Sequence, residues 1–235
     1  MTLPVAILAG GLATRLRPIT ETIPKSLVEV AGKPFVLRQL ALLRRHGITR
    51  VVMCVGHLAE QIEAVVGDGH ALGLDVAYSH DGPRLVGTGG ALRQALPLLG
   101  DAFLVMYGDS YLTCDYAAVA RTFEASDALG LMTVFRNDGR FDASNVRYER
   151  GRILQYDKTP GLRGMTHIDY GLGALRAAAF AGYAEGQPLD LARVYQDLLA
   201  RDQLIGFEVH ERFYEIGSAN GLEDTRRFIA SQEET

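Results

Sequence analysis

Short apolar runs alternate with helix-like stretches over the first 135 residues of this chain, and this alternation constrains the fold more than any other feature. The runs predicted as strands are 4–9, 49–55, 74–79, 102–107 and 129–135, and the predicted helices are 34–46, 58–66, 90–99 and 116–126. Repeated strand–helix units build a largely parallel sheet with helices on both faces. We therefore predict an α/β fold, a Rossmann-like three-layer sandwich with a mixed, mostly parallel central sheet.

The last hundred residues follow a different pattern. Segments 145–148 and 152–156 predict an antiparallel hairpin, and strands are predicted over 167–175, 204–209 and 213–216. The remaining predicted helices cover 189–200 and 218–229, the second after Ser218, a residue type favoured at helix N-caps. Because no linker, repeat or low-complexity run divides the 235 residues, we expect one domain over residues 1–235.

Composition narrows the range of partners and compartments. A net charge of −4 without a broad basic surface argues against nucleic acid as a partner. The absence of a signal-peptide pattern and of a long apolar run predicts a cytoplasmic protein with no membrane partner. Cys54 and Cys114 are isolated in or beside apolar runs, which predicts reduced structural thiols. A homo-oligomer stays open.

A polar loop follows the first predicted strand. Gly10 and Gly11 end the strand, and the loop then carries Thr14, Arg15, Arg17 and Lys25. Glycines allow backbone N–H groups to approach an anion, Arg provides a planar fork for phosphate oxygens, and Lys adds a point charge. The spacing matches neither GxxxxGK[ST] nor GxGxxG. At the carboxyl end of a first strand, such a loop predicts a site for a polyphosphate.

Two further segments carry candidate binding chemistry. Residues 87–90 form a glycine-rich turn at the start of a predicted helix, where a flat base or ribose could lie on the backbone. Asp109 follows the buried run 102–107, at the strand end where α/β folds place their chemistry. Its carboxylate is a hard oxygen ligand suited to Mg²⁺, which binds one or two carboxylates together with substrate phosphates.

These segments resemble those of the sugar-1-phosphate nucleotidyltransferases. LAGGLATRLRPIT followed by PKS is similar to that family's LAGGxGTRLxPxT followed by PKP, with Ala13 in place of Gly and Ser26 in place of Pro. VGTGGAL at 86–92 matches the family's glycine-rich turn, and Gly108-Asp109 matches its metal-binding Gly-Asp. The resemblance implies transfer of a nucleotidyl group from a nucleoside triphosphate to a sugar 1-phosphate, with release of pyrophosphate, for precursors of cell-surface polysaccharides.

The resemblance also implies residue roles. Arg15, Lys25 and Asp109 are implied as catalytic residues. The residues implied to bind the nucleotide are Leu8, Ala9, Gly10, Gly11, Thr14, Arg15, Gly87, Thr88, Gly89 and Gly90. Those implied to bind the sugar phosphate are Lys158, where DKTP stands for the family's EKP, and Asp169, Tyr170 and Gly171, where DYG stands for NxGxY. Glu215, in place of the Asp in WxD[IT]GT, is implied as the second Mg²⁺ ligand beside Asp109.

The base and the acceptor stay open at this stage. The glycine-rich turn at 86–92 and the short chain look most like those of bacterial guanylyltransferases, which use GTP and act on heptose or mannose 1-phosphate. Uridylyl, cytidylyl and thymidylyl transfer are alternatives. Transfer to a non-sugar phosphate such as phosphocholine is a second alternative. A third is a catalytically silent nucleotide-binding regulatory subunit, which Ala13 and Glu215 would support.

Overall fold

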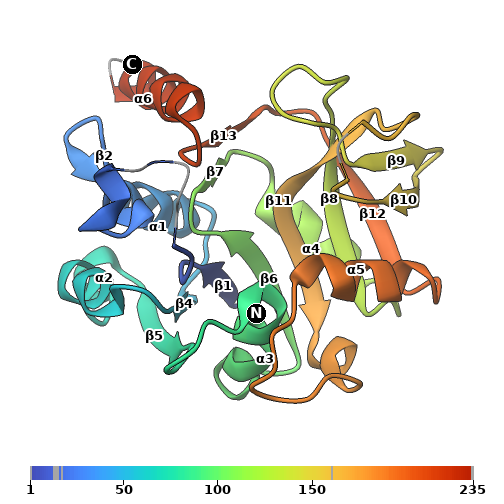
Figure 1. The fold of residues 1–235 in the computed structure, drawn as a ribbon, viewed down its shortest axis with the longest axis horizontal. Helices are drawn as coiled ribbons and strands as arrows, with labels where there is room; N and C mark the ends of the chain where they lie inside the picture. The colour runs from blue at the N-terminus through green and yellow to red at the C-terminus, as the bar shows by residue number, and fades with distance from the viewer. Residues whose placement is uncertain (1, 13–15, 17, 160, 234–235) are drawn as a thin grey trace.

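A nine-stranded mixed sheet runs through the part of the chain that this computed structural model describes, residues 2–12, 16, 18–159 and 161–233 (Figure 1). Its main path is β10-β9-β11-β6-β1-β4-β5, with β8 beside β11 and β12 beside β8. The strands are β1 (Val5–Leu8), β4 (Arg50–Val55), β5 (Asp75–His80), β6 (Ala102–Tyr107), β8 (Gly130–Arg136), β9 (Val146–Glu149), β10 (Arg152–Tyr156), β11 (His167–Arg176) and β12 (Leu204–Val209). Only β10 and β11 run against the common direction of the described strands, which confirms the predicted mixed, mostly parallel sheet.

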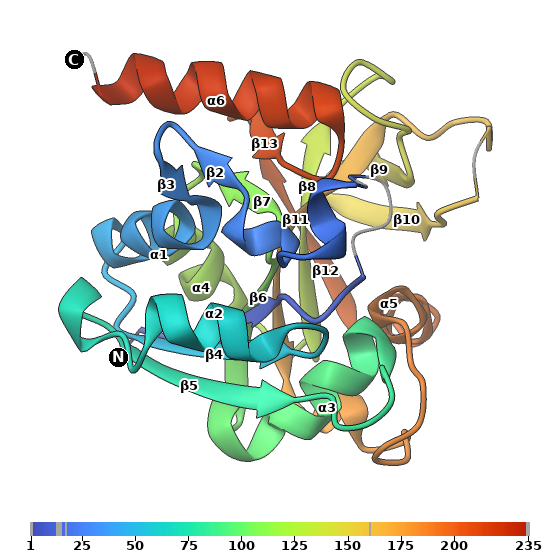
Figure 2. The same cartoon turned by 60° about the vertical axis from the view of Figure 1, so that its left-hand side comes forward.

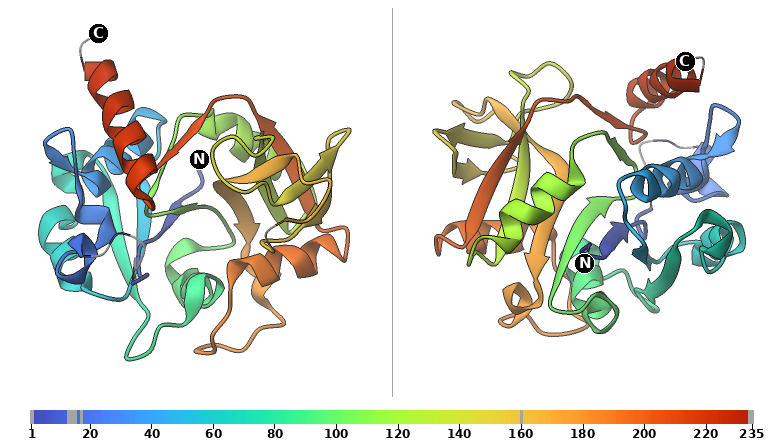
Figure 3. Two further views of the ribbon diagram at one scale, coloured as in Figure 1. Left: turned by 45° about the horizontal axis from the view of Figure 1, so that its top comes forward. Right: turned by 180° about the vertical axis from the view of Figure 1, so that it is seen from behind.

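Helices cover both faces of this sheet. On one face lie α1 (Phe35–Arg45), α2 (Ala59–Val66) and α4 (Tyr116–Glu124), and on the other lie α3 (Gly87–Leu99) and α5 (Leu191–Leu199), as the two views of Figure 3 show. The alternation of side chains in β1 explains the two cores. Val5 and Ile7 pack on the side of α1, and Ala6 packs on the side of α3. The predicted three-layer α/β fold is confirmed.

A smaller apolar cluster lies beside the main sheet. It joins α6 (Ala219–Glu233) to two short ladders, β2 (Glu29–Val30) with β3 (Lys33–Pro34), and β7 (Ser110–Leu112) with β13 (Phe213–Glu215) (Figure 2). Val30, Phe35, Tyr111, Ile216 and Ile229 are buried together there. Because β7 follows β6 directly, this cluster places β13 and α6 next to the end of a central strand.

Most predicted elements agree with the structure to within one to three residues, with two informative differences. α3 begins at Gly87 rather than at residue 90, because the glycine-rich turn forms the first turn of the helix. α6 continues to Glu233 rather than ending at 229. The sequence did not indicate β2, β3 or β7, nor the short 3₁₀ helices η2 (Ile19–Glu21), η3 (Lys25–Leu27), η4 (His70–Leu72) and η5 (Ala177–Phe180).

Two predictions from composition can be compared with this fold. Cys54 and Cys114 are buried free cysteines, and burial raises the pKa of each thiol to about 12, so neither is a thiolate near neutral pH. Among the described residues, no helix combines the length and the apolar character needed to cross a membrane.

Candidate functional site

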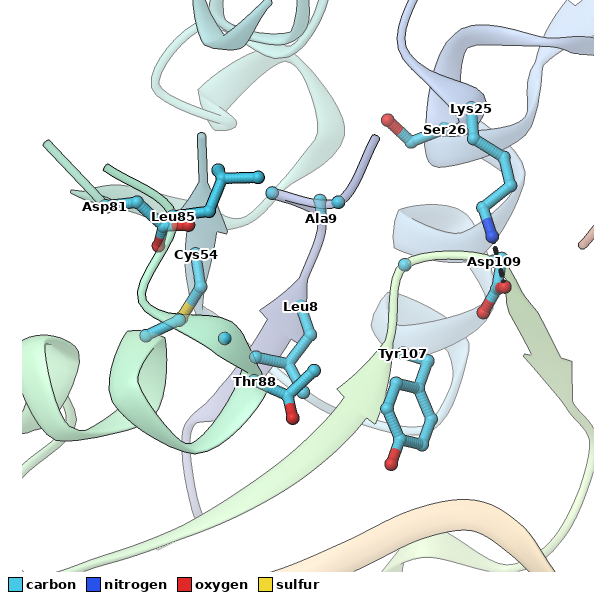
Figure 4. A pocket seen from close by; sticks show the side chains of 15 residues that line it. Leu8, Ala9, Lys25, Ser26, Cys54, Asp81, Leu85, Thr88, Tyr107 and Asp109 are labelled. Atoms are coloured by element: carbon cyan, nitrogen blue, oxygen red, sulfur yellow. Dashed lines mark hydrogen bonds and ion pairs between the residues drawn. The ribbon is translucent and has the colours of Figure 1, made fainter. Parts of the chain in front are cut away.

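Four adjacent parallel strands end at the same edge of the sheet. The residues that follow β5, β4, β1 and β6 there are Asp81, Gly56, Ala9-Gly10 and Gly108-Asp109. A cavity of about 240 Å³ lies at this edge (Figure 4). It is lined by Leu8, Ala9, Gly10, Gly11, Lys25, Ser26, Cys54, Asp81, Leu85, Gly87, Thr88, Ala91, Tyr107, Gly108 and Asp109. Open α/β sheets bind their ligands at such carboxyl ends.

One end of the cavity carries an ion pair. Pro24 leads into the 3₁₀ helix η3, and the Leu27 N–H donates to the Pro24 carbonyl (2.9 Å), so the first residue of η3, Lys25, projects toward β6. Its Nζ lies 2.5 Å from Asp109 Oδ2 (Figure 4). The two side chains are 22% and 21% exposed, so solvent and a ligand can reach both. Thr14 and Arg15, predicted for the same loop, lie outside the described residues.

The two glycines after β1 differ in their surroundings. A Cβ on Gly10 would lie 3.1 Å from Asp81 Oδ2 and 3.1 Å from the Gly56 nitrogen, so this position has no room for a larger side chain. A Cβ on Gly11 would meet nothing within 4 Å among the described residues. Gly11 therefore leaves open space beside the backbone, and a ligand can approach the loop there.

Asp81 is a lining residue that our sequence interpretation missed. It lies at the other end of the cavity from Asp109, across β1 (Figure 4), and is 7% exposed. Burial raises the pKa of Asp81 to about 6, against a hydrogen bond from the Val86 backbone that lowers it. The signal was available, because Asp81 follows a predicted strand as Asp109 does. A buried carboxylate in a cleft is typical of functional sites.

The glycine-rich turn 87–90 has two roles in the structure. Gly87 and Thr88 line the cavity. Gly89 and Gly90 are buried instead against the segment before α5, where both N–H groups donate to the Leu189 carbonyl (2.8 and 3.1 Å). A Cβ on Gly89 would lie 2.8 Å from Leu189 Cγ, so packing alone requires a glycine there. The cavity lining therefore includes the first two of the four predicted residues.

The residues predicted for the sugar side lie outside the cavity lining but are linked to it. Lys158 Nζ lies 3.6 Å from Asp190 Oδ1, which also accepts a hydrogen bond from Thr88 (3.2 Å). The carboxylate of Asp169 accepts from the Gly171 N–H (3.0 Å) and from the Tyr156 hydroxyl (3.4 Å). Burial raises the pKa of Asp169. Thr88 thus connects the cavity lining to the Lys158–Asp190 ion pair.

Strand β11 brings one predicted residue close to Asp109 and places another in the core. Gly171 has φ +98° within an irregularity of the β11–β8 register, and a Cβ there would lie 3.4 Å from Ser110 Oγ. Bulges of this kind occur next to active sites. Tyr170 is 2% exposed and packs against the rings of Phe135 and Phe213, away from the cavity.

Glu215 is close to Asp109 along the backbone but its carboxylate has other partners. It pairs with Ser110 in the β13–β7 ladder. The carboxylate accepts hydrogen bonds from the Gly217 N–H, the Ser218 N–H (3.1 Å) and the Ser218 hydroxyl (2.6 Å), at the start of α6. Over the described ranges, no cluster of three or more His, Cys, Asp or Glu side chains is arranged to hold a metal ion.

Comparison with known proteins shows which sequences this chain is similar to. A nucleotidyl transferase family model matches residues 5–142. The chain is 33% identical over 231 residues to an N-acetylmuramate α-1-phosphate uridylyltransferase of Neisseria meningitidis serogroup B, covering 94% of this chain and 95% of the relative. It is 39% identical over 218 residues to a mannose-1-phosphate guanylyltransferase catalytic subunit beta of Danio rerio, covering 90% of this chain and 60% of the relative.

Solved structures share the fold. The crystal structure of HddC from Yersinia pseudotuberculosis complexed with GMP-PN superposes with a TM-score of 0.81 at 22% identity, and the match covers 97% of this chain and 100% of that one. At this level of identity the likeness concerns the arrangement of the elements.

Proposed function

We propose, because this chain belongs to the nucleotidyl transferase family, that it transfers a nucleotidyl group from a nucleoside triphosphate to a sugar 1-phosphate and releases pyrophosphate. The observation that carries this proposal is the Lys25–Asp109 ion pair at one end of a cavity that Gly10 and Gly11 also line. A cation, a carboxylate and an open glycine backbone are the groups that a reacting polyphosphate requires.

The reaction needs no protein nucleophile. An oxygen of the sugar phosphate attacks the α-phosphorus, a new P–O bond forms, the bond to the β-phosphate breaks, and pyrophosphate leaves. The enzyme contributes positioning and neutralisation of charge. We assign neutralisation at the α-phosphate to Lys25, and binding of the other phosphates to the N–H groups of Gly10 and Gly11 together with Arg15.

Asp109 fits a Mg²⁺ ligand. Its Oδ1 accepts only a long hydrogen bond from Ser110 Oγ (3.4 Å) among the described residues, which leaves that oxygen available at the cavity wall. Mg²⁺ bound there would neutralise negative charge on the substrate phosphates, and phosphate oxygens would supply further ligands of the ion. Glu215 as the second ligand stays a prediction, because its carboxylate would have to release the start of α6 first.

Guanine is the base that we favour, on the chemistry of Asp81. The guanine edge presents two adjacent donors, N1–H and N2–H, which a carboxylate can accept together. Uracil and thymine present one N–H between two carbonyl oxygens, which a carboxylate repels. The relatives do not rank the bases, because the guanylyltransferase match (39% identity) covers 60% of that relative and the uridylyltransferase match (33% identity) covers 95% of the other. Uridylyl transfer is therefore the alternative.

We favour mannose or heptose 1-phosphate as acceptor, for precursors of cell-surface polysaccharides; the relative from Danio rerio is named for mannose 1-phosphate. Lys158 is proposed to face the sugar phosphate, because Asp190 joins it to Thr88 of the cavity lining. Asp169 and Gly171 are proposed for the same side, because the charge of Lys158 acts on Asp169 and Gly171 lies beside Ser110, the residue after Asp109. A single domain over residues 1–235 and a cytoplasmic location remain predictions, and a homo-oligomer stays open.

The test is a matrix of substrates. The protein is incubated with Mg²⁺, each of five nucleoside triphosphates, and mannose, heptose, glucose or N-acetylmuramate 1-phosphate or phosphocholine, and pyrophosphate release is followed. We expect the highest rate with GTP and mannose or heptose 1-phosphate. A maximum with UTP would overturn the guanine assignment and retain the reaction class. Nucleotide binding without pyrophosphate release from any pair would contradict the enzymatic proposal and favour a regulatory subunit.

A further inference from the structure

We propose that Gln39 is a positioning residue: it holds the turn that carries Asp109 where the Asp109 carboxylate can reach Lys25. This inference rests on the proposed function of the same site. Gln39 lies on α1, outside the cavity lining, and no motif in the sequence points to it.

The burial of Gln39 is the first observation. Its side chain is 0% exposed and lies on the inner side of α1, where Val36, Leu40 and Leu43 pack into the main core. A buried amide costs free energy unless hydrogen bonds compensate for the water that it loses. An apolar residue of similar size would pack there without that cost, so we infer that the amide has a specific role.

The hydrogen bonds of Gln39 provide that reason. Its Nε2 donates to the Tyr107 carbonyl (2.9 Å) and to the Ser110 carbonyl (2.8 Å), which uses both of its hydrogens. These two carbonyls flank Gly108 and Asp109. The buried Oε1 finds no partner among the described residues, so the two donated bonds are what the amide supplies.

Two backbone hydrogen bonds from other elements also hold the main chain of this turn. The Gly108 N–H donates to the Leu8 carbonyl (2.9 Å), and the Ile216 N–H donates to the Asp109 carbonyl (2.9 Å). The turn is therefore held by β1, by the residue after β13 and by α1. Of these three contacts the one from Gln39 comes from a side chain, so substitution can remove it and leave the backbone contacts possible.

Positioning matters here because the Asp109 carboxylate must lie within reach of Lys25 and of the reacting phosphate. A displacement of about 1 Å can cost a rate factor on the order of 10². Without the two donors, the Tyr107 and Ser110 carbonyls would be buried and unpaired, and the turn would shift to find other partners. Gln39 would then act on catalysis through Asp109 without touching substrate.

The test compares Gln39→Met, which keeps the length and removes both donors, with Gln39→Glu, which keeps the shape and has at most one donor. Asn137→Ala is the matched control, because Asn137 is another fully buried amide that holds a turn, through Asp142 and Ser144, outside the cavity lining. We expect kcat to fall about 10- to 100-fold in Gln39→Met and less in Gln39→Glu. The nucleotide Kd should change less than about threefold, and Asn137→Ala should lower Tm while keeping kcat within about twofold of wild type.

A second measurement does not depend on the proposed reaction. Hydrogen exchange at the Gly108 and Ile216 amides should become at least about tenfold faster in Gln39→Met, while amides of β4 keep their rates. If the wild-type protein turns over none of the substrates but exchange is still faster in Gln39→Met, the positioning role is retained and the proposed function is overturned. Unchanged exchange with kcat within about threefold of wild type in both Gln39 variants would overturn the positioning role. So would an equal loss of kcat in Asn137→Ala.

Discussion

Lys25 carries the one basic side chain among the described residues that line the cavity. Because the α-phosphate gains negative charge as pyrophosphate leaves, Lys25→Ala should lower kcat by about 10²–10³, as loss of one transition-state charge contact does elsewhere. Pyrophosphate release with saturating substrates measures this. Lys33→Ala, an exposed lysine in the β2–β3 ladder, is the matched control. A rate within tenfold of wild type would remove Lys25 from this role.

Asp109 differs from Lys25 in what its loss should change. Asp109→Asn keeps the shape of the side chain and removes the charge that both Lys25 and Mg²⁺ would contact. We therefore expect turnover to be abolished at ordinary Mg²⁺, with the rate measured across a Mg²⁺ titration. Asp127→Asn, an exposed aspartate before β8, shows the effect of removing a carboxylate elsewhere. Activity retained at ordinary Mg²⁺ would place the metal at other ligands.

At the scale of elements, the start of α6 depends on Glu215. Its carboxylate satisfies N–H groups that a helix start leaves unpaired, and a Cβ on Gly221 would overlap Glu215 Oε1, so Gly221 makes room for the carboxylate. Glu215→Ala should lower the free energy of unfolding by about 1–2 kcal/mol without Mg²⁺. Urea denaturation measures this, with Asp115→Ala, which removes the cap of α4, as the comparison.

A second substitution at Glu215 tests the predicted second metal ligand. Glu215→Gln keeps an oxygen that can accept from the start of α6, so it should lose less stability than Glu215→Ala. If Glu215 also binds Mg²⁺, Glu215→Gln must raise the Mg²⁺ concentration for half-maximal rate. An unchanged Mg²⁺ dependence would leave Glu215 with the helix contact alone.

Elements with a strong periodic pattern could be predicted from the sequence, and short ones could not. The helix predicted over 34–46 became α1 (Phe35–Arg45), because its apolar residues recur at helical spacing and form one buried face. β2, β3 and β7 have two or three residues each, too few for any period to appear. Val30 of β2 and Tyr111 of β7 are buried in one cluster with Leu222 and Ile229 of α6, so the packing of these strands depends on a helix almost two hundred residues after β2.

The same limit applied to the site. Lys25 and Asp109 could be anticipated, because a lysine in a basic loop and an aspartate after a buried strand are local signals. The buried positions of Gly89 and Gly90 depend on Leu189, about a hundred residues away, so the glycines alone could not distinguish packing from ligand binding. Gln39 gave no signal either, since its partners are backbone carbonyls of another element.

At the scale of the whole molecule, the sheet order brings four strand ends to one edge, and stability and binding compete there. Asp81 is buried at that edge, and within the described ranges it forms no ion pair with a lysine or arginine. Its folded-state pKa is about 6 against an ordinary value of 3.8. The folded protein therefore binds a proton at Asp81 more tightly than the unfolded chain does. The contribution of Asp81 to stability is fully present below pH 3.8 and is lost as the pH rises through about 6.

Asp81→Asn removes this titration and keeps an oxygen that can accept from the Val86 backbone. The variant should therefore be more stable than wild type by about 1 kcal/mol at pH 4.5 and by about 3 kcal/mol at pH 7 and above, because the charged form is penalised only in the wild-type protein. Urea denaturation at pH 4.5, 5.5, 7 and 8 measures the difference, and Asp75→Asn, exposed at the start of β5, gives the background. A difference that does not grow with pH would contradict the buried charge. A more stable variant that has lost its preference for GTP would show that this charge is retained for binding at the expense of stability.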